Sequence, residues 1–308
     1  MLYINKLALI KKKENSMFKK AYEIASQYTH PVILSMKFFD NTVESGLGSF
    51  VILNDEGWIV TCAHILDPAF AHQNHSKEIS DFTRKVDSIK NNPKLKHHIK
   101  QRQIKKITPN KKWITNFSFW WGNDVFRISQ FEILRENDLA IGKIENYDKN
   151  FQKTYPTLKN PANIKNGASL CKLGYPFHNV KTEFIEATTS FKLDPNVFPI
   201  PRFPIDGIFT RNVFSGKSKD GKYDIKYLET STPGLKGQSG GPTFDIDGNI
   251  WAIQSKTHNL NLGFSPKIKQ GNKIVEENQF LNVGWGIHIE TLVKFLTDKN
   301  VKFQLTAD

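Results

Sequence analysis

Three segments of the sequence each place a reactive side chain beside small residues at the end of an apolar run. They are TCAH, which ends at His64, NDLA, which contains Asp138, and GQSGGP, which contains Ser239. A serine hydroxyl is a weak nucleophile at neutral pH and needs a base within hydrogen-bond reach, and that base needs a third group to orient it and to stabilise its charged form. We therefore predict that Ser239, His64 and Asp138 supply these three functions.

The glycines around Ser239 allow a backbone conformation that other residues would not. Gly237 lets the backbone turn so that its N–H and that of Ser239 point at one spot, where a negatively charged oxygen would develop. Gly240 and Gly241 leave room for the backbone of a substrate. A Gly-Gln-Ser-Gly-Gly segment taken alone is more often a flexible turn, but the preceding TCAH and NDLA segments favour the catalytic interpretation.

The elements that must position these residues are mainly strands. Many short apolar segments separated by Gly, Asn and Asp predict antiparallel β-barrels rather than a parallel sheet. Helical spacing predicts a leading helix over residues 16–28, a helical insertion over 76–107 with a break at Asn91-Asn92-Pro93, and a last helix from Glu290 to Asp298. We expect the insertion to form a helical hairpin.

The positive charge of the chain is concentrated in two stretches. The net charge is +13, of which residues 1–20 carry +5 and residues 76–112 carry +9, so the remainder carries −1. The insertion is interpreted either as a lysine-rich solvated face or as a docking surface for an acidic protein or nucleic acid.

Cysteine usage and hydropathy bear on the compartment. The two cysteines, Cys62 and Cys171, are too few for a disulfide framework and fit a reducing environment as small buried side chains. The N-terminal MLYINKLALIKKK does not follow the pattern of a signal peptide, and we see no apolar run long enough to span a membrane. These features predict a cytoplasmic protein.

Histidines of the insertion were considered as metal ligands. Their spacing matches no zinc pattern and no cysteine lies near them, so we expect neither a metal site nor a cofactor. The histidines are His72, His75, His97 and His98.

The segments GSFVI, WIVTCAHIL, NDLAIGKIE, LGYP and GQSGGPTFDIDGNIWAIQS resemble the trypsin/chymotrypsin-like serine peptidases. The resemblance is strongest to the bacterial branch that includes the high-temperature-requirement proteases and the glutamyl endopeptidases, and the chain order of His, Asp and Ser is also that of chymotrypsin. It covers about residues 31–66 and 125–298. It implies two antiparallel six-stranded β-barrels of trypsin type, here with an N-terminal helix, a basic helical insertion in the first barrel and a C-terminal helix.

The resemblance also implies roles and boundaries. His64 is expected as general base and acid, Asp138 as its orienting partner, Ser239 as nucleophile, and the amides of Gly237 and Ser239 as the oxyanion hole. We expect a basic N-terminal segment over 1–30, a peptidase unit over 31–298 with its insertion at about 70–112, and a C-terminal tail over 299–308.

One departure from the family bears on activation. Gln238 precedes the nucleophile, where the digestive enzymes carry an Asp that pairs with a newly cut N-terminal amine. Activity is therefore not expected to require release of a new N-terminus.

The resemblance also outlines the pocket for the substrate side chain before the cut. No acidic residue stands at its expected base, which disfavours a preference for Lys or Arg. Lys256 or His258 could favour an acidic residue, although a solvated lysine at a strand end is the simpler interpretation. The pocket residues implied are Thr232, Pro233, Gly234, Gln254, Ser255, Lys256 and Gly284.

Two functions of different classes follow. The first is a serine endopeptidase that cuts a protein substrate through an acyl-enzyme intermediate, with a partner on the basic insertion as its trigger. Some bacterial trypsin-like proteases act in this way in defence modules. The second is an inactive module of the same fold that binds nucleic acid or an acidic protein through residues 76–112.

Overall fold

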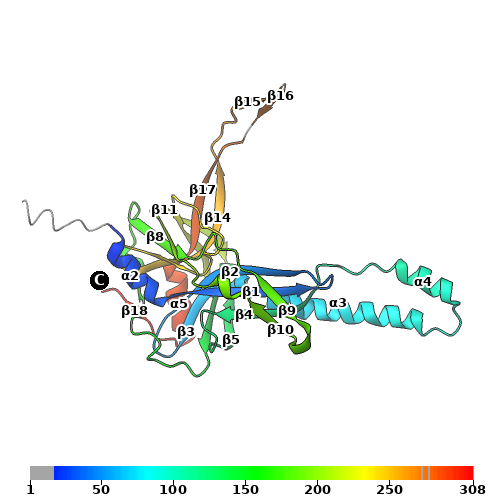
Figure 1. Cartoon of the computed structure of the whole chain (residues 1–308). Coiled ribbons are helices and arrows are strands. Elements are labelled where there is room, and N and C mark those ends of the chain that lie inside the picture. Colours follow the sequence, from blue (N-terminus) through cyan, green and yellow to red (C-terminus); the bar gives the residue numbers. More distant parts are fainter. Residues whose placement is uncertain (1–16, 272, 277, 308) are drawn as a thin grey trace, which may run out of the picture.

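The computed structural model describes residues 17–271, 273–276 and 278–307, so the predictions for residues 1–16 lie outside the described part of the chain. A first antiparallel sheet has the strand order β4-β1-β2-β3-β6-β5 and curls on itself (Figure 1). The rings of Trp121 on β4 and Phe131 on β5 contact each other, with centroids 5.6 Å apart. The strands are β1 (Thr29–Phe38), β2 (Val43–Ile52), β3 (Trp58–Cys62), β4 (Ile114–Trp121), β5 (Ile128–Leu134) and β6 (Leu139–Ile144).

A second sheet closes into a barrel. Its order is β13-β8-β11-β12-β17-β14-β7-β18, and β13 also pairs with β14, which joins six of these strands in a ring. The short strands β7 and β18 extend the sheet in parallel beside β14. The strands are β7 (Thr157–Leu158), β8 (Ser169–Gly174), β11 (Phe203–Lys217), β12 (Asp224–Thr230), β13 (Pro242–Phe244), β14 (Ile250–Asn261), β17 (Phe280–His288) and β18 (Gln304–Leu305).

The helices lie close to where the sequence predicts them, except that the first helix of the insertion begins at Asp67 rather than at residue 76. They are α2 (Lys19–Tyr28), α3 (Asp67–Lys90), α4 (His97–Lys105) and α5 (Ile289–Asp298), with short 3-10 helices at Ala63–Leu66, Arg135–Asn137, Pro161–Asn163, Glu186–Thr188 and Pro195–Val197. The long helix α3 leads away from the barrels and carries α4 at its far end (Figure 1). The predicted fold class, a trypsin-like β fold with these helical additions, is confirmed.

The base of the helical insertion is fixed to the first sheet. Nε2 of His72 lies 3.0 Å from the carbonyl oxygen of Thr115, and Nδ1 of His75 accepts a hydrogen bond of 2.9 Å from the backbone N–H of Ile114. The Trp113 ring contacts Phe39 and Phe82 edge to face. These two histidines therefore hold α3 against β4.

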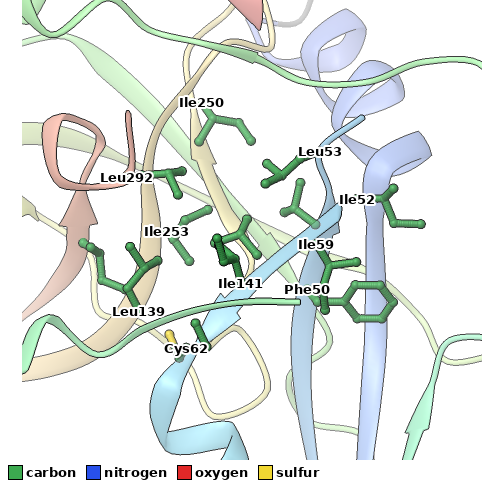
Figure 2. Close-up of a cluster of buried hydrophobic side chains, with 14 of the residues drawn as sticks. Phe50, Ile52, Leu53, Ile59, Cys62, Leu139, Ile141, Ile250, Ile253 and Leu292 are labelled. Atoms are coloured by element: carbon green, nitrogen blue, oxygen red, sulfur yellow. The ribbon is translucent and has the colours of Figure 1, made fainter. Parts of the chain in front are cut away.

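The core runs continuously from one sheet to the other. Side chains of the first sheet, such as Ile59, Leu139 and Ile141, pack in the same cluster as Ile253 of β14 and Leu292 of α5 (Figure 2). All five side chains are fully buried. Because burying one such side chain contributes about 1.5–3 kcal/mol, this shared core holds the two sheets in one relative position.

The sequence did not predict two projecting hairpins. Strands β14 and β17 continue beyond the barrel as a paired arm, with β15 (Lys267–Gln270) and β16 (Lys273–Glu276) at its tip (Figure 1). A second hairpin, β9 (Thr182–Ile185) and β10 (Ser190–Leu193), lies beside β2.

Candidate active site

His64 and Asp138 meet because β3 pairs with β6. The last residue of β3, Cys62, is opposite Leu139, the first residue of β6, so the residues just outside these strand ends lie side by side. The backbone N–H of Ala63 donates to the carbonyl oxygen of Asp138 at 2.9 Å. Asp138 itself has a φ of 58°, in the left-handed region that residues other than glycine adopt rarely.

The Asp138 carboxylate holds the His64 imidazole from one side. Nδ1 of His64 lies 2.8 Å from Oδ2 and 3.0 Å from Oδ1 of Asp138, and the backbone N–H of His64 donates to Oδ1 at 2.9 Å. The His64 side chain is 42% exposed and that of Asp138 is 20% exposed. The imidazole can therefore contact a substrate, while the carboxylate is shielded behind it.

This pairing sets the charge of both groups. Burial lowers the pKa of His64, but the hydrogen bond and negative charge of Asp138 outweigh it, so the pKa lies above its usual 6.5. Burial raises the pKa of Asp138, but its hydrogen bonds with His64 and Ser255 outweigh that effect and lower it below 3.8. At neutral pH Asp138 is an anion, and its charge stabilises the protonated form of the His64 imidazole whenever that form arises.

Ser239 reaches the same place through strand β14. Its Oγ donates a hydrogen bond of 3.1 Å to the carbonyl oxygen of Ser255, while Oγ of Ser255 donates to Oδ2 of Asp138 at 2.6 Å. In the described part of the chain, Ser239 Oγ makes no hydrogen bond with the imidazole of His64. The three predicted residues are thus linked through Ser255.

The loop around Ser239 needs its glycines. Gly240 has a φ of 85°, and a Cβ there would lie 2.0 Å from the carbonyl oxygen of Ser49. Gly237 has a φ of 100°, and a Cβ there would lie 2.4 Å from the carbonyl oxygen of Tyr175. Both positions are closed to any side chain, because of backbone strain and contact with neighbouring backbone atoms.

The same loop leaves two donors free. Within residues 17–271, 273–276 and 278–307, the backbone N–H groups of Gly237 and Ser239 donate to no protein acceptor. The Gly237 carbonyl is fixed by Ser49 Oγ at 2.8 Å and by the N–H of Tyr175 at 3.1 Å. The loop is held from behind, and the two amides remain available to bind a negatively charged oxygen.

Gln238 is fully buried and helps to hold this loop. Its Oε1 accepts from the backbone N–H of Leu235 at 2.9 Å, and its Nε2 donates to the carbonyl oxygen of Phe203 at 3.3 Å. The side chain at this position therefore takes its partners from the neighbouring backbone.

The segments predicted to line the substrate pocket come together. The hydroxyl of Thr257 donates to the carbonyl oxygen of Gly234, and Thr230 Oγ1 donates to the carbonyl oxygen of Gly284 at 3.3 Å. Nε2 of Gln254 donates to the carbonyl oxygens of Lys256 and Trp285, at 3.1 and 3.2 Å. We call residues 232–234, 254–257 and 284–285 together the specificity slot, after the role that the family resemblance implies.

The two basic residues considered for this slot lie on an aromatic surface. The Lys256 ammonium lies over the Tyr227 and Trp285 rings, 4.4 and 5.3 Å from their centroids. The His258 ring stacks on Trp285 at a centroid distance of 4.5 Å. The sequence analysis did not single out Lys172, whose ammonium group is buried behind the slot, because a lysine in a strand is usually exposed.

Cys62 is the third polar side chain near His64 and Asp138. Ligand atoms of these three residues lie within 4.8 Å of one another. The Cys62 thiol is fully buried and donates to the carbonyl oxygen of Gln254 at 3.1 Å, and burial raises the pKa of the thiol. Because a metal binds the thiolate, a buried thiol that keeps its proton is a poor metal ligand.

The family described as trypsin-like peptidase domain matches residues 46–253. No curated protein matches the chain. The structure is similar to an HtrA-type protease, AlgW, with a tripeptide (16% identity, TM-score 0.44, 92% of this chain and 64% of that one). It is also similar to a substituted form of AlgW with a decapeptide (13% identity, TM-score 0.45, 92% and 67%).

The chain thus spans 64% of the length of AlgW with the tripeptide. Among the described residues, no helix is long and apolar enough to cross a membrane. The family match covers more than half of the sequence and includes His64, Asp138 and Ser239. The chain belongs to the trypsin-like peptidase family.

Proposed function

We propose that this protein is a serine endopeptidase whose nucleophile, general base and orienting acid are Ser239, His64 and Asp138. One observation carries the proposal. The His64 imidazole lies between the Asp138 carboxylate and solvent, with its Nδ1 2.8 Å from Oδ2 of Asp138. The carboxylate fixes the tautomer in which Nε2 is free to accept a proton. The raised pKa of His64 supports this role, since the imidazole must hold a proton between two steps.

The reaction proceeds in two halves. Ser239 Oγ turns from the Ser255 carbonyl toward His64, loses its proton to Nε2 and bonds to the carbonyl carbon of the substrate. The free amides of Gly237 and Ser239 bind the resulting oxyanion. His64 then gives the proton to the leaving amine as the peptide bond breaks. A water molecule, deprotonated by His64, next attacks the acyl-enzyme, which releases the carboxylic acid of the product and restores Ser239.

Digestion of a peptide library derived from a proteome tests this function. The wild-type protein should generate new peptide termini, and Ser239→Ala should generate none while its unfolding midpoint stays the same. Ser88→Ala, which removes an exposed hydroxyl on α3, is the matched control and should cut like the wild type. A Ser239→Ala protein that cuts as fast as the wild type would overturn the assignment.

We also propose that an acidic partner docks on the helical insertion and controls the protease. The support is charge and exposure, because Lys94, Lys96, Arg102 and Lys105 of the distal part are all exposed and residues 76–112 carry a net charge of +9. Several like charges on one projecting element attract polyanions over about a Debye length. We place this activity in the cytoplasm, which suits the buried, unpaired Cys62 and Cys171.

Binding of a short double-stranded DNA and of poly-glutamate tests the docking site. Changing the four distal residues to Glu should abolish binding to either polyanion. The control changes Lys149, Lys153, Lys165 and Lys219 to Glu, which alters total charge equally and should retain binding. A gel shift of the wild type combined with no peptide cleavage would favour the alternative, an inactive binding module. No binding to either polyanion would overturn the docking proposal.

A further inference from the structure

Lys172 of β8 places a buried ammonium group against the wall of the specificity slot. The residue is 1% exposed, and its Nζ donates to Oγ1 of Thr232 and to the carbonyl oxygen of Pro233, both at 2.9 Å. It also donates to the carbonyl oxygen of Thr232 and to Oγ1 of Thr230. Pro233 is one of the residues that the family resemblance implies for the pocket, so the ammonium contacts the wall of the slot.

A glycine on the opposite side brings the slot close to this charge. A Cβ at Gly284 would lie 2.8 Å from Nζ of Lys172 and 2.7 Å from the carbonyl oxygen of Thr232. Gly284 therefore lets its strand pass close to the ammonium, where the side chain of any other residue would clash. The charge therefore lies beside Gly284 and Pro233, two of the residues implied to line the pocket.

No carboxylate of the described residues forms an ion pair with Lys172. Its four partners are uncharged oxygens, and burial lowers the pKa of the ammonium to about 7. The buried Glu229 is already paired with Arg211, at 2.9 Å. Asp206 on β11 is exposed, and its backbone carbonyl rather than its carboxylate contacts Thr232. A buried cation without a counter-ion is costly, and an anion brought beside it removes part of that cost.

We propose that Lys172 makes this protease prefer an acidic residue, Glu or Asp, immediately before the cut. The inference rests on the proposed endopeptidase function. The substrate carboxylate enters the slot as the Gln254 side chain moves aside, and it adds a counter-charge to that of Asp206. The protons of Lys172 already bind backbone and threonine oxygens. Lys172 therefore acts on the substrate carboxylate through its charge, across Thr232 and Pro233, rather than by a direct hydrogen bond.

Gln254 supplies the competing possibility. Its side chain crosses the slot, since a Cβ at Gly234 would lie 2.1 Å from its Nε2. Its Oε1 is buried and has no donor among the described residues. That oxygen could accept a hydrogen bond from a substrate amide, which would select Gln or Asn instead. The two possibilities differ in charge but not in shape, so a pair of isosteric substrates separates them.

Four peptides that differ in the residue before the cut, Glu, Gln, Leu or Lys, test the proposal on the wild-type protein. Cleavage after Glu should exceed cleavage after Gln by about tenfold or more in kcat/KM, the order expected for one charge pair at a few ångströms in a partly polar interior. A ratio of one or below would overturn the proposal. A Gln preference would assign the selection to Gln254.

A variant assigns the preference to Lys172. Lys172→Met removes the charge and keeps the length of the side chain, so the Glu-to-Gln ratio should fall to about one. Lys219→Met, at a side chain that is 94% exposed, is the control and should keep the ratio. Reaction with a fluorophosphonate reports whether the variant still has a folded active site, and an unchanged ratio in a reactive variant would contradict the role of Lys172.

The test also separates this inference from the proposed function. If no peptide is cut and no serine reacts with the fluorophosphonate, the endopeptidase function itself fails. If peptides are cut without regard to charge, the function stands and the specificity inference fails.

Discussion

Ser255 donates its hydroxyl proton to Oδ2 of Asp138 at 2.6 Å, the same oxygen that lies 2.8 Å from Nδ1 of His64. Through its carbonyl oxygen Ser255 also accepts the hydroxyl of Ser239 at 3.1 Å. One residue of β14 therefore touches both the acid and the nucleophile, and it couples the second barrel to the two residues that the first sheet supplies.

Ser255→Ala tests the hydrogen bond to the acid. Removal of the hydroxyl leaves the backbone carbonyl in place but deprives the Asp138 carboxylate of a charge-assisted bond, which is worth about 1.5–3 kcal/mol. We expect kcat/KM to fall by about tenfold, with the unfolding midpoint nearly unchanged. Steady-state kinetics on a peptide substrate measure this, and Ser88→Ala should show no loss. Unchanged kinetics in Ser255→Ala would mean that Asp138 does not need this donor.

The pH dependence of activity should follow the ionisation of His64. The general base must be neutral to accept the Ser239 proton, so kcat/KM should be high above the pKa of His64 and fall as the pH drops through it. Because Asp138 raises this pKa, the fall should be centred above the usual value of 6.5. A profile of kcat/KM between about pH 5 and 9 measures it.

Asp138→Asn provides the matched change for this profile. The amide is nearly isosteric but carries no charge, so the centre of the acid limb should move to lower pH and activity should fall by about 10³–10⁴-fold, as in other triads. An acid limb that stays in place would show that another group titrates.

The two glycines with the closest backbone contacts give a structural prediction. Gly240→Ala would force a Cβ to within 2.0 Å of the Ser49 carbonyl at a φ of 85°, so we expect loss of fluorophosphonate reaction and destabilisation by several kcal/mol. The control is Gly221→Ala. Gly221 has a φ of 70°, but a Cβ there would have no atom within 4 Å, so this variant should lose only the energy of backbone strain, about 1 kcal/mol. Urea unfolding compares the two, and equal effects would contradict the close packing at Gly240.

Trp113 should control the attachment of the helical insertion. Its ring is 8% exposed, contacts Phe39 and Phe82, and its Nε1 donates to Glu78. Truncation to Ala should free α3 from β4 and make its lysines more susceptible to added trypsin, with little effect on the barrels. Phe177→Ala, at a side chain that is 79% exposed, is the control. Equal digestion of Trp113→Ala and the wild type would show that the histidine contacts alone hold the helix.

The proposed catalytic residues could be predicted because their constraints are local. Glycines surround Ser239, and His64 and Asp138 stand at the ends of paired strands, so short segments carry the information. The segments implied for the pocket also lie together, although their role stays a prediction. The positions of Lys172 and Gln254 depend on packing between β8, β12, β14 and β17. No local pattern distinguishes a buried lysine in a strand from an exposed one.

The projecting arm was missed for a related physical reason. Residues 256–261 are mostly polar and exposed on both faces, so they lack the alternation by which a half-buried strand is identified. Their pairing with residues 280–285 is set by the register that begins inside the barrel, where Ala252 is opposite His288. The hydrogen-bond ladder continues outward from there without help from the hydrophobic pattern.

The most direct test of the account is the site at which a fluorophosphonate attaches. The reagent bonds to an activated serine oxygen with loss of fluoride, and mass spectrometry of the digested protein locates the adduct. The account predicts one adduct on Ser239, absent from Ser239→Ala and strongly reduced in Asp138→Asn. Wild-type protein that stays unlabelled where a control serine protease reacts, or an adduct on another residue, would contradict it.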